Sequence, residues 1–221
     1  MTGPNDATAP GRRRDAQRNR ELLIEAAHEV FAEQGLHAPI DVIARRAGIG
    51  NATLYRHFPT RAALVDAVFR DQLTDTMTAG EQARGTDDAL AGLTGYLRTV
   101  FAGLAADRGT NDLMTTHLDG VDSLQAVHAH NRRTVETLLS RGQDQGTIRT
   151  DVTPEDLLFA LAALGRTVPS LTAAAGPDAW LRPLALLLDG LRGTSAAPPL
   201  PVPALTAAQL DQALQGLGPG S

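Results

Sequence analysis

The sequence has 221 residues but no cysteine, no lysine and few aromatic side chains. Without cysteine the chain can form no disulfide, no thiolate metal site and no cysteine nucleophile, which is compatible with a reducing compartment. Aromatic residues make up 4% of the chain, although 43% of it is hydrophobic. A hydrophobic core must therefore be built mainly from leucine, alanine and valine.

Long apolar runs and signatures of catalysis are also missing. No uninterrupted apolar run approaches the ~18 residues of a membrane span, and the opening MTGPNDATAPGRRR lacks the apolar stretch of a secretory signal. We therefore expect a soluble, cytoplasmic protein that does not enter a membrane. No nucleophile–base pair, glycine-rich phosphate loop or paired-acid arrangement stands out, so we expect no enzyme and no cofactor. His128 and His130 could suggest a metal site, but positions two apart point to different sides of a helix, so we expect none.

Positive charge is concentrated at one end of an acidic chain, whose formal net charge is −5. Residues 1–70 contain ten arginines and eight acids, a balance of +2, whereas residues 71–221 contain ten arginines and 17 acids, a balance of −7. Five of the arginines fall within residues 11–20. The N-terminal third is thus suited to meet a phosphate backbone, although a solvated basic tail would show the same charge pattern.

Apolar residues recur at three- and four-residue steps and no segment alternates like a strand, which predicts an all-α chain of about nine helices with a short extra helix at the C-terminus. The expected helices cover residues 18–34, 39–44, 51–57, 60–77, 88–106, 112–118, 123–145, 154–166, 178–192 and 207–215. Their expected breaks are Gly35, Gly109, Gly146, Pro169 and Gly176. Helix caps are expected at Thr60, Thr153 and Thr206.

The segment from Pro39 to Arg61, PIDVIARRAGIGNATLYRHFPTR, has the features of a helix-turn-helix. This motif needs a small residue where its two helices cross and a residue that tolerates positive φ in the turn. Ala44 and Gly48 meet these two needs. The apolar face that holds the helices together is expected from Ile40, Ile43, Ala47, Ile49, Leu54 and Phe58.

The second helix of this motif has two faces. Leu54 and Phe58 are four residues apart and can point inward together. Thr53, Arg56 and His57 then share another face, which is free to enter a major groove about 12 Å wide. This arrangement predicts a helix that reads DNA; a helical bundle that does not bind DNA is the alternative.

At these residues the chain resembles the TetR (tetracycline-repressor-like) family, and within it a subgroup with the recognition segment T-L-Y-R-H-F-P-T-R, here residues 53–61. The resemblance is specific over residues 18–70 and weaker afterwards. It implies a three-helix DNA-binding head, a linking fourth helix and a helical regulatory and dimerisation bundle. The chain is then divided into a disordered basic arm, a helix-turn-helix domain, a ligand-binding and dimerisation domain, and a Pro-rich arm with a short helix, at residues 1–17, 18–62, 63–193 and 194–221.

The resemblance also implies roles for single residues. The candidate DNA-binding residues are Arg45, Gly50, Asn51, Ala52, Thr53, Tyr55, Arg56, His57 and Arg61. Arg56 can hold a guanine through two hydrogen bonds. The Tyr55 hydroxyl and Arg61, which replaces the family's usual lysine, are expected on phosphates. Arg45 and Arg46 are expected to clamp the backbone, or else to form a solvated face.

Two late helices carry apolar residues on more than one side, which indicates burial on more than one side. These residues are Leu157, Leu158, Leu161, Ala162 and Leu164 in the first helix, and Trp180, Leu181, Leu184, Leu187, Leu188 and Leu191 in the second. In the family such helices pack as a four-helix bundle between two subunits, so we expect a homodimer with recognition helices about 34–36 Å apart. The alternative is the internal core of a monomer.

A mostly apolar set with a few polar groups is the candidate lining of an inducer cavity: Tyr96, Phe101, Met114, His117, His128 and Asn131. A plain helical core would show the same pattern. The combined prediction is a sequence-specific regulator of transcription, a repressor that a small-molecule inducer releases from a palindromic double-stranded DNA operator. The alternative is a DNA-bound regulator without a ligand, whose C-terminal domain binds a protein partner.

Overall fold

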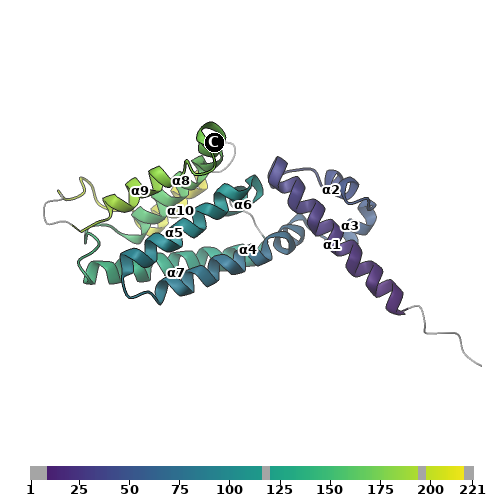
Figure 1. Cartoon of the computed structure of the whole chain (residues 1–221), viewed down its shortest axis with the longest axis horizontal. Coiled ribbons are helices and arrows are strands. Elements are labelled where there is room, and N and C mark those ends of the chain that lie inside the picture. The colour runs from purple at the N-terminus through teal and green to yellow at the C-terminus, as the bar shows by residue number, and fades with distance from the viewer. Residues whose placement is uncertain (1–8, 116–119, 194–197, 217–221) are drawn as a thin grey trace, which may run out of the picture.

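The computed structural model describes residues 9–115, 120–193 and 198–216, and within these ranges its helices confirm the predicted all-α class (Figure 1). The helices are α1 (Ala9–Gln34), α2 (Ile40–Arg46), α3 (Asn51–His57), α4 (Arg61–Arg84), α5 (Ala89–Ala106), α6 (Arg108–Thr115), α7 (Asp122–Asp144), α8 (Pro154–Ala175), α9 (Leu181–Gly190) and α10 (Ala207–Gly216). One isolated antiparallel bridge joins Ile148 and Arg192. Figure 1 shows a head of α1–α3 beside a body of the remaining helices, with α4 running from one to the other.

The predicted helix caps are present. The Thr60 hydroxyl accepts a hydrogen bond from the Ala63 N–H at 3.1 Å and so fixes the start of α4. Thr153 and Asp156 form a reciprocal capping box at the start of α8, with Pro154 in the first turn. At the start of α10 the Thr206 N–H donates to the Gln209 side chain at 2.9 Å, and the Gln209 N–H donates back to Thr206. The expected breaks at residues 35, 146 and 176 are glycines with positive φ.

Two expected helix breaks are wrong, because tertiary packing overrides local preference. Gly109 lies inside α6, where a Cβ atom would come within 3.0 Å of Phe31 and Phe69, so the glycine lets α6 approach the head closely. Pro169 lies inside α8, which continues to Ala175, and its neighbour Val168 is fully buried. As a result α6 begins four residues earlier than predicted, and α8 ends nine residues later.

The first helix is also longer than predicted. It begins at Ala9 rather than at residue 18, so residues 9–17 are helical where we expected a disordered arm. Arginine and glutamine are good helix formers, and the Gln17 amide donates to the Glu21 carboxylate one turn later at 2.7 Å. The remaining expected arm, residues 1–8, lies outside the described residues.

The head and the body each have a hydrophobic core. In the head, the fully buried Leu23, Phe31 and Leu54 belong to a cluster that continues into α4 through Leu64 and Phe69. In the body, α5, α7, α8 and α9 enclose a second cluster in which the Phe101 and Trp180 rings stack with centroids 6.2 Å apart. The two clusters meet along α4 and α6, so the head is packed against the body.

Two helices are long and apolar enough to cross a membrane by length and composition alone, although the sequence contains no uninterrupted apolar run of that length. They are α5, with a mean hydropathy of 1.3, and α8, with a mean hydropathy of 1.5. Helix α5 lies in the body core, where Leu93, Leu97 and Phe101 are buried. In the apolar stretch of α8, 17% of the helix is buried inside the chain. A large part of its apolar surface therefore lacks a partner in the single chain.

Candidate nucleic-acid interface and ligand cavity

A four-residue turn sets the angle between α2 and α3. The Ile49 N–H donates to the Ala44 carbonyl at 2.9 Å, which folds the chain back over the end of α2. Gly48 has a φ of +67°, a left-handed conformation that other residues adopt at a cost. The predicted roles of Ala44, which is buried, and of Gly48 in the turn are thus confirmed.

Helix α3 is anchored from one side and open on the other. The Leu54 side chain is 0% exposed and the Phe58 side chain is 2% exposed, and both belong to the head core. On the opposite side Tyr55 is 51% exposed and Arg56 is also exposed. At the start of the helix, Gly50 caps α3 without a side-chain hydrogen bond, and Asn51 and Ala52 are exposed. This face presents side chains that can reach base edges and phosphates.

Thr53 and His57 lie at the border of this face and are half-buried. The His57 Nε2 atom is buried without a hydrogen-bond partner among the described residues, and its ring lies beside Phe58 with centroids 6.4 Å apart. The ring therefore also packs against the helix's own anchor. Base contacts of Thr53 and His57 remain predictions.

The two adjacent arginines at the end of α2 lie in different environments. Arg45 is 73% exposed and lies 3.8 Å from Asp41 on its own helix. Arg46 donates two hydrogen bonds of 2.8 Å to Glu33, which joins α2 to α1. This pairing raises the pKa of Arg46 and lowers that of Glu33 through the hydrogen bond between them. Arg45 is thus available to a phosphate, whereas Arg46 holds the head together.

Arg61, at the start of α4, is tied to the loop that precedes α2. Its Nη1 donates to the carbonyls of Leu36 at 2.7 Å and Ala38 at 2.8 Å. These bonds fix the start of α4 against the helix-turn-helix, a structural role that the sequence did not indicate. The phosphate contact predicted for Arg61 remains a prediction for its other nitrogens.

Helix α6 connects the body to the head. The Asp112 carboxylate accepts from the Leu36 N–H at 3.1 Å, immediately after α1 ends. Asp107 lies 4.0 Å from His28 on α1. Helix α6 also packs against α5 and α8 in the body. A displacement of α6 by a change in the body would therefore be transmitted to the head.

The described residues of the set predicted to line an inducer cavity do not surround a common cavity. Phe101 stacks on Trp180 in the body core, and the Tyr96 hydroxyl donates to the Asn131 side chain. Burial raises the pKa of Tyr96 above its usual value. His128 is exposed, and His117 lies outside the described residues. Of the predicted set, Met114 alone is among the residues that line the cavity described next.

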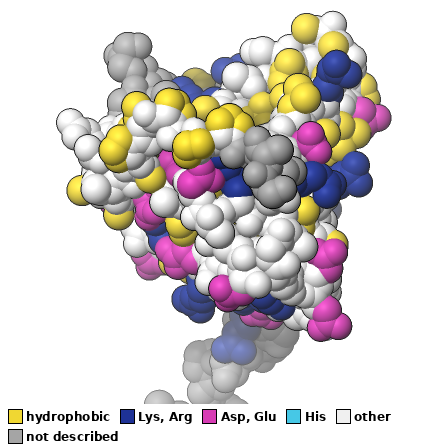
Figure 2. Space-filling model, turned by 90° about the vertical axis from the view of Figure 1, so that its left-hand side faces the viewer, with side chains coloured by type: hydrophobic (Ala, Val, Ile, Leu, Met, Phe, Trp, Pro, Cys, Tyr) yellow, Lys and Arg dark blue, Asp and Glu magenta, His cyan; other side chains and the backbone are white. Residues whose placement is uncertain are grey.

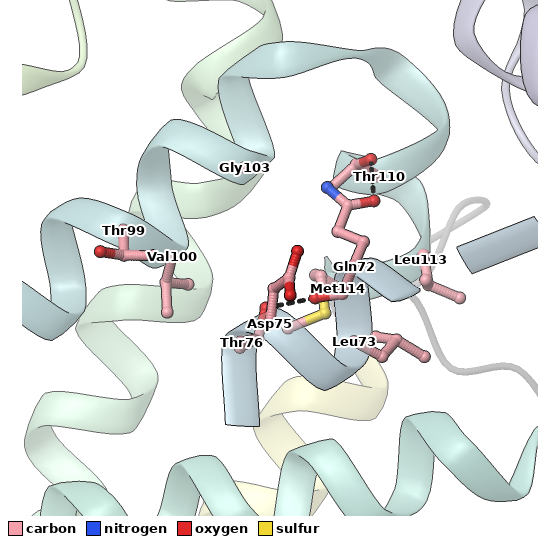
Figure 3. Close-up of a pocket in the computed structure, with 10 residues that line it drawn as sticks. All are labelled: Gln72, Leu73, Asp75, Thr76, Thr99, Val100, Gly103, Thr110, Leu113 and Met114. Carbon is pink, nitrogen blue, oxygen red and sulfur yellow. Dashed lines mark hydrogen bonds between the residues drawn. The ribbon is translucent and has the colours of Figure 1, made fainter. Parts of the chain in front are cut away.

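A cavity of about 170 Å³ lies between α4, α5 and α6 (Figure 3). Its lining residues are Gln72, Leu73, Asp75, Thr76, Thr99, Val100, Gly103, Thr110, Leu113 and Met114. Figure 3 shows Gln72 reaching from α4 toward Thr110 on α6, and the Thr110 hydroxyl donates to its side-chain oxygen at 2.9 Å. Spacing along α4 puts Gln72 and Thr76 on one face, but no local pattern indicates that this face meets α6.

Comparisons with known proteins agree with this geometry. Residues 23–68 match the family described as bacterial regulatory proteins, tetR family, and residues 88–193 match the C-terminal domain described as transcriptional regulator SbtR-like. An HTH-type transcriptional regulator from Staphylococcus aureus (strain USA300) is 37% identical over 73 residues, which are 33% of this chain and 40% of that regulator. The match to this curated relative thus spans less than half of its length.

Solved structures extend the likeness to the body. The TetR transcriptional regulator SCO0520 from Streptomyces coelicolor is 28% identical, with a TM-score of 0.53 over 80% of this chain and 99% of that one. The transcriptional regulator FadR from Bacillus subtilis, solved in complex with stearoyl-CoA, is 20% identical and shares the fold, with a TM-score of 0.60 over 78% and 99% of the two chains. With a matching head, a matching body and an exposed face on α3, the chain belongs to the TetR family of DNA-binding transcriptional regulators.

Proposed function

We propose that the protein is a homodimeric cytoplasmic repressor that leaves a palindromic operator when a small molecule binds its body. The exposed face of α3 carries the DNA-reading half of this proposal. Leu54 and Phe58 anchor the helix in the head core, so Tyr55 and Arg56 can turn outward without loss of packing. A surface of this kind can enter the major groove, where Arg56 would hold a guanine through two hydrogen bonds.

The experiment compares two arginines with different assigned roles. Operator sequences are first obtained by selection from a random DNA pool. Arg56→Ala should then weaken binding to the selected site by ~1–3 kcal/mol and relax base preference at one position. The control, Arg45→Ala, should weaken binding by a similar factor on all sequences, because a phosphate contact carries no base information. Equal losses for Arg56→Ala on selected and random DNA would contradict base reading by this residue.

Exposed apolar surface on α8 and α9 supports the dimer. Helix α8 buries only Leu157, Gly165 and Val168 in its own chain, and Leu186 on α9 is 66% exposed. Figure 2 views the molecule from its body end and shows hydrophobic side chains gathered on its upper part, the side where Figure 1 places α8 and α9. Exposed apolar side chains gathered on one side of a protein are typical of an interface. Pairing of these helices with a second copy would give the four-helix bundle expected for the family.

The position of the cavity supports release by a ligand. Its walls belong to α4, which begins in the head, and to α6, which contacts α1 through Asp112 and Leu36. A ligand that separates α4 from α6 would therefore change the angle of each head. Such a ligand shifts the equilibrium only if its affinity differs between the two arrangements. Unchanged head spacing in solution scattering, with and without a bound effector, would contradict this mechanism.

The cavity also favours this function over a regulator that acts through a protein partner alone, since such a regulator needs no internal space. The relative of similar fold from Bacillus subtilis was solved with stearoyl-CoA, so a protein of this architecture can bind a small molecule. A molecule that fits the cavity between α4, α5 and α6, at about 170 Å³, is much smaller than stearoyl-CoA.

A further inference from the structure

We propose that the cavity between α4, α5 and α6 takes a small organic cation, an ammonium group on an apolar body about the size of one ring. This inference deepens the proposed function and rests on it, since it names the class of ligand that would control release. Three observations carry it: the size of the cavity, the supply of hydrogen-bond acceptors in its lining, and the position of Asp75.

The volume sets the size of the ligand. A cavity of about 150 Å³ with apolar walls is enough to hold benzene, and the present cavity measures about 170 Å³. Leu73, Val100, Leu113 and Met114 supply apolar walls, and Gly103 leaves one side without a side chain. A Cβ atom added at Gly103 would meet only the Gln72 amide nitrogen, at 3.6 Å. The body of the ligand is therefore a single ring or a branched chain of similar volume.

The hydroxyls in the lining are acceptors rather than donors, because each donates its proton elsewhere. The Thr76 hydroxyl donates to the Gln72 carbonyl at 3.0 Å, and the Thr99 hydroxyl donates to the Gly95 carbonyl at 3.2 Å. The Thr110 hydroxyl donates to the Gln72 side chain, and Asp107 lies next to it as a second acceptor. What these hydroxyls offer a ligand is their lone pairs, so a ligand that bonds to them must bring the donors. The Gln72 amide, whose nitrogen lies beside Gly103, is the side-chain donor of the lining.

The only charge among the residues that line the cavity is negative. Asp75 is its single ionisable residue, and none of the ten lining residues is cationic. Figure 3 shows the Asp75 side chain directed into the space bounded by Val100, Gly103 and Gln72. Asp75 forms no ion pair with the described residues and is exposed at the mouth of the cavity. An ammonium can pair with this carboxylate while it stays partly hydrated, whereas a carboxylate ligand would face like charge in an acceptor-rich site.

Three probes of nearly equal shape test the class of ligand on the full-length protein: benzylamine, benzyl alcohol and benzoate. Binding is measured by titration calorimetry, with fluorescence of the single tryptophan, Trp180, as a second signal. Benzylamine should bind about fivefold more tightly than benzyl alcohol, the upper end for a partly exposed ion pair, and benzoate should bind most weakly. Benzoate affinity equal to or above that of benzylamine would overturn the proposal.

Three variants test whether the preference for benzylamine arises in this cavity. Asp75→Asn should reduce the preference for benzylamine over benzyl alcohol to less than about twofold, with little change for the alcohol. The control is Asp71→Asn, which removes the same charge from the same helix at an exposed position that does not line the cavity. Gly103→Leu should fill the cavity and abolish binding of both probes, provided that circular dichroism shows a folded protein. Loss of the preference in Asp71→Asn, or unchanged binding in Gly103→Leu, would place the site elsewhere and refute the inference.

A second readout separates this inference from the proposed function. Release of a labelled operator is followed at saturating benzylamine. If benzylamine binds with the predicted preference and the operator stays bound, the cation site stands and ligand control through this cavity is contradicted. If benzylamine does not bind while the protein still binds its operator, the cation site is refuted and the DNA-binding function is unaffected.

Discussion

Gly48 in the turn between α2 and α3 shows how one residue sets the interface. Its φ of +67° is a conformation that costs an L-residue roughly 1–2 kcal/mol, and a Cβ atom at this position would meet nothing within 4 Å. Gly48→Ala should therefore lower the free energy of unfolding by about 1 kcal/mol through backbone strain alone. Urea denaturation followed by circular dichroism measures this change.

The control for Gly48→Ala is Gly95→Ala. Gly95 lies inside α5, is exposed and likewise has open space around its Cβ position, but its backbone is helical. Alanine at this position should stabilise the protein by roughly 0.5–1 kcal/mol, because it restricts the unfolded chain. Equal effects of the two substitutions would mean that φ at Gly48 does not matter to the head.

Arg45 and Arg46 allow a second residue-scale prediction, because neighbours in sequence have different partners. Arg45→Ala should reduce the salt dependence of DNA binding by about one counterion and leave the melting temperature unchanged. Arg46→Ala should lower the melting temperature, since it removes both hydrogen bonds to Glu33 and frees α2 from α1. Binding as a function of salt and thermal unfolding are measured on both variants. The same pattern for both arginines would contradict their different roles.

At the scale of elements, the contact between α4 and α7 centres on a buried histidine. His130 on α7 is 5% exposed, and its Nε2 lies 3.3 Å from Arg84 Nη1 on α4. Gly80 makes this approach possible, since a Cβ atom there would lie 2.3 Å from the same nitrogen. Burial, and then the charge of Arg84, lowers the pKa of His130 below its usual 6.5. Nearby Glu81 opposes this change, and Arg133 on α7 adds to it.

This contact predicts a loss of stability in acid. Because the pKa of His130 is lower in the folded chain, the unfolded chain binds the proton first as the pH falls. The contribution is complete above pH 6.5 and is lost as the pH drops from 6.5 toward the lower folded value. The free energy of unfolding is measured with urea at about pH 7.5 and about pH 5.5. Its loss between these two pH values should be smaller for His130→Gln than for the unmodified protein, because glutamine stays neutral and can still accept a hydrogen bond from Arg84. The exposed His37→Gln should keep the full loss; if it does not, the effect belongs to another group.

The elements also show what the sequence could predict. The helix-turn-helix was predictable because a local pattern determines it: Leu54 and Phe58 four residues apart, a glycine in the turn and a threonine cap at Thr60. Gly109 and Pro169 were misread as breaks because their roles depend on distant neighbours. The cavity lining was missed for the same reason, since Gln72 on α4 and Thr110 on α6 meet only through the packing of three helices.

For the whole molecule, the distribution of charge and the position of the head both favour an approach to DNA with the head first. Residues 1–70 carry a balance of +2 and the rest of the chain carries −7, so the head should be attracted to DNA while the body is repelled from it. Figure 1 shows the head at one end, with α3 on the side away from the body. This separation orients the chain on approach to DNA, and two such heads on one dimer would read two half-sites.

The dimer itself gives the last prediction, because reading a palindrome needs both copies. Leu186 on α9 is 66% exposed in the single chain, so Leu186→Arg should leave the fold and its melting temperature intact. In the dimer the same arginine would be buried without a partner, which is strongly unfavourable. The dimer dissociation constant, from analytical ultracentrifugation, should rise at least about tenfold, which corresponds to ~1.4 kcal/mol. Val202→Arg, which alters an equally exposed residue outside α8 and α9, should leave the constant unchanged, and a dimer unaffected by Leu186→Arg would place the interface on another face.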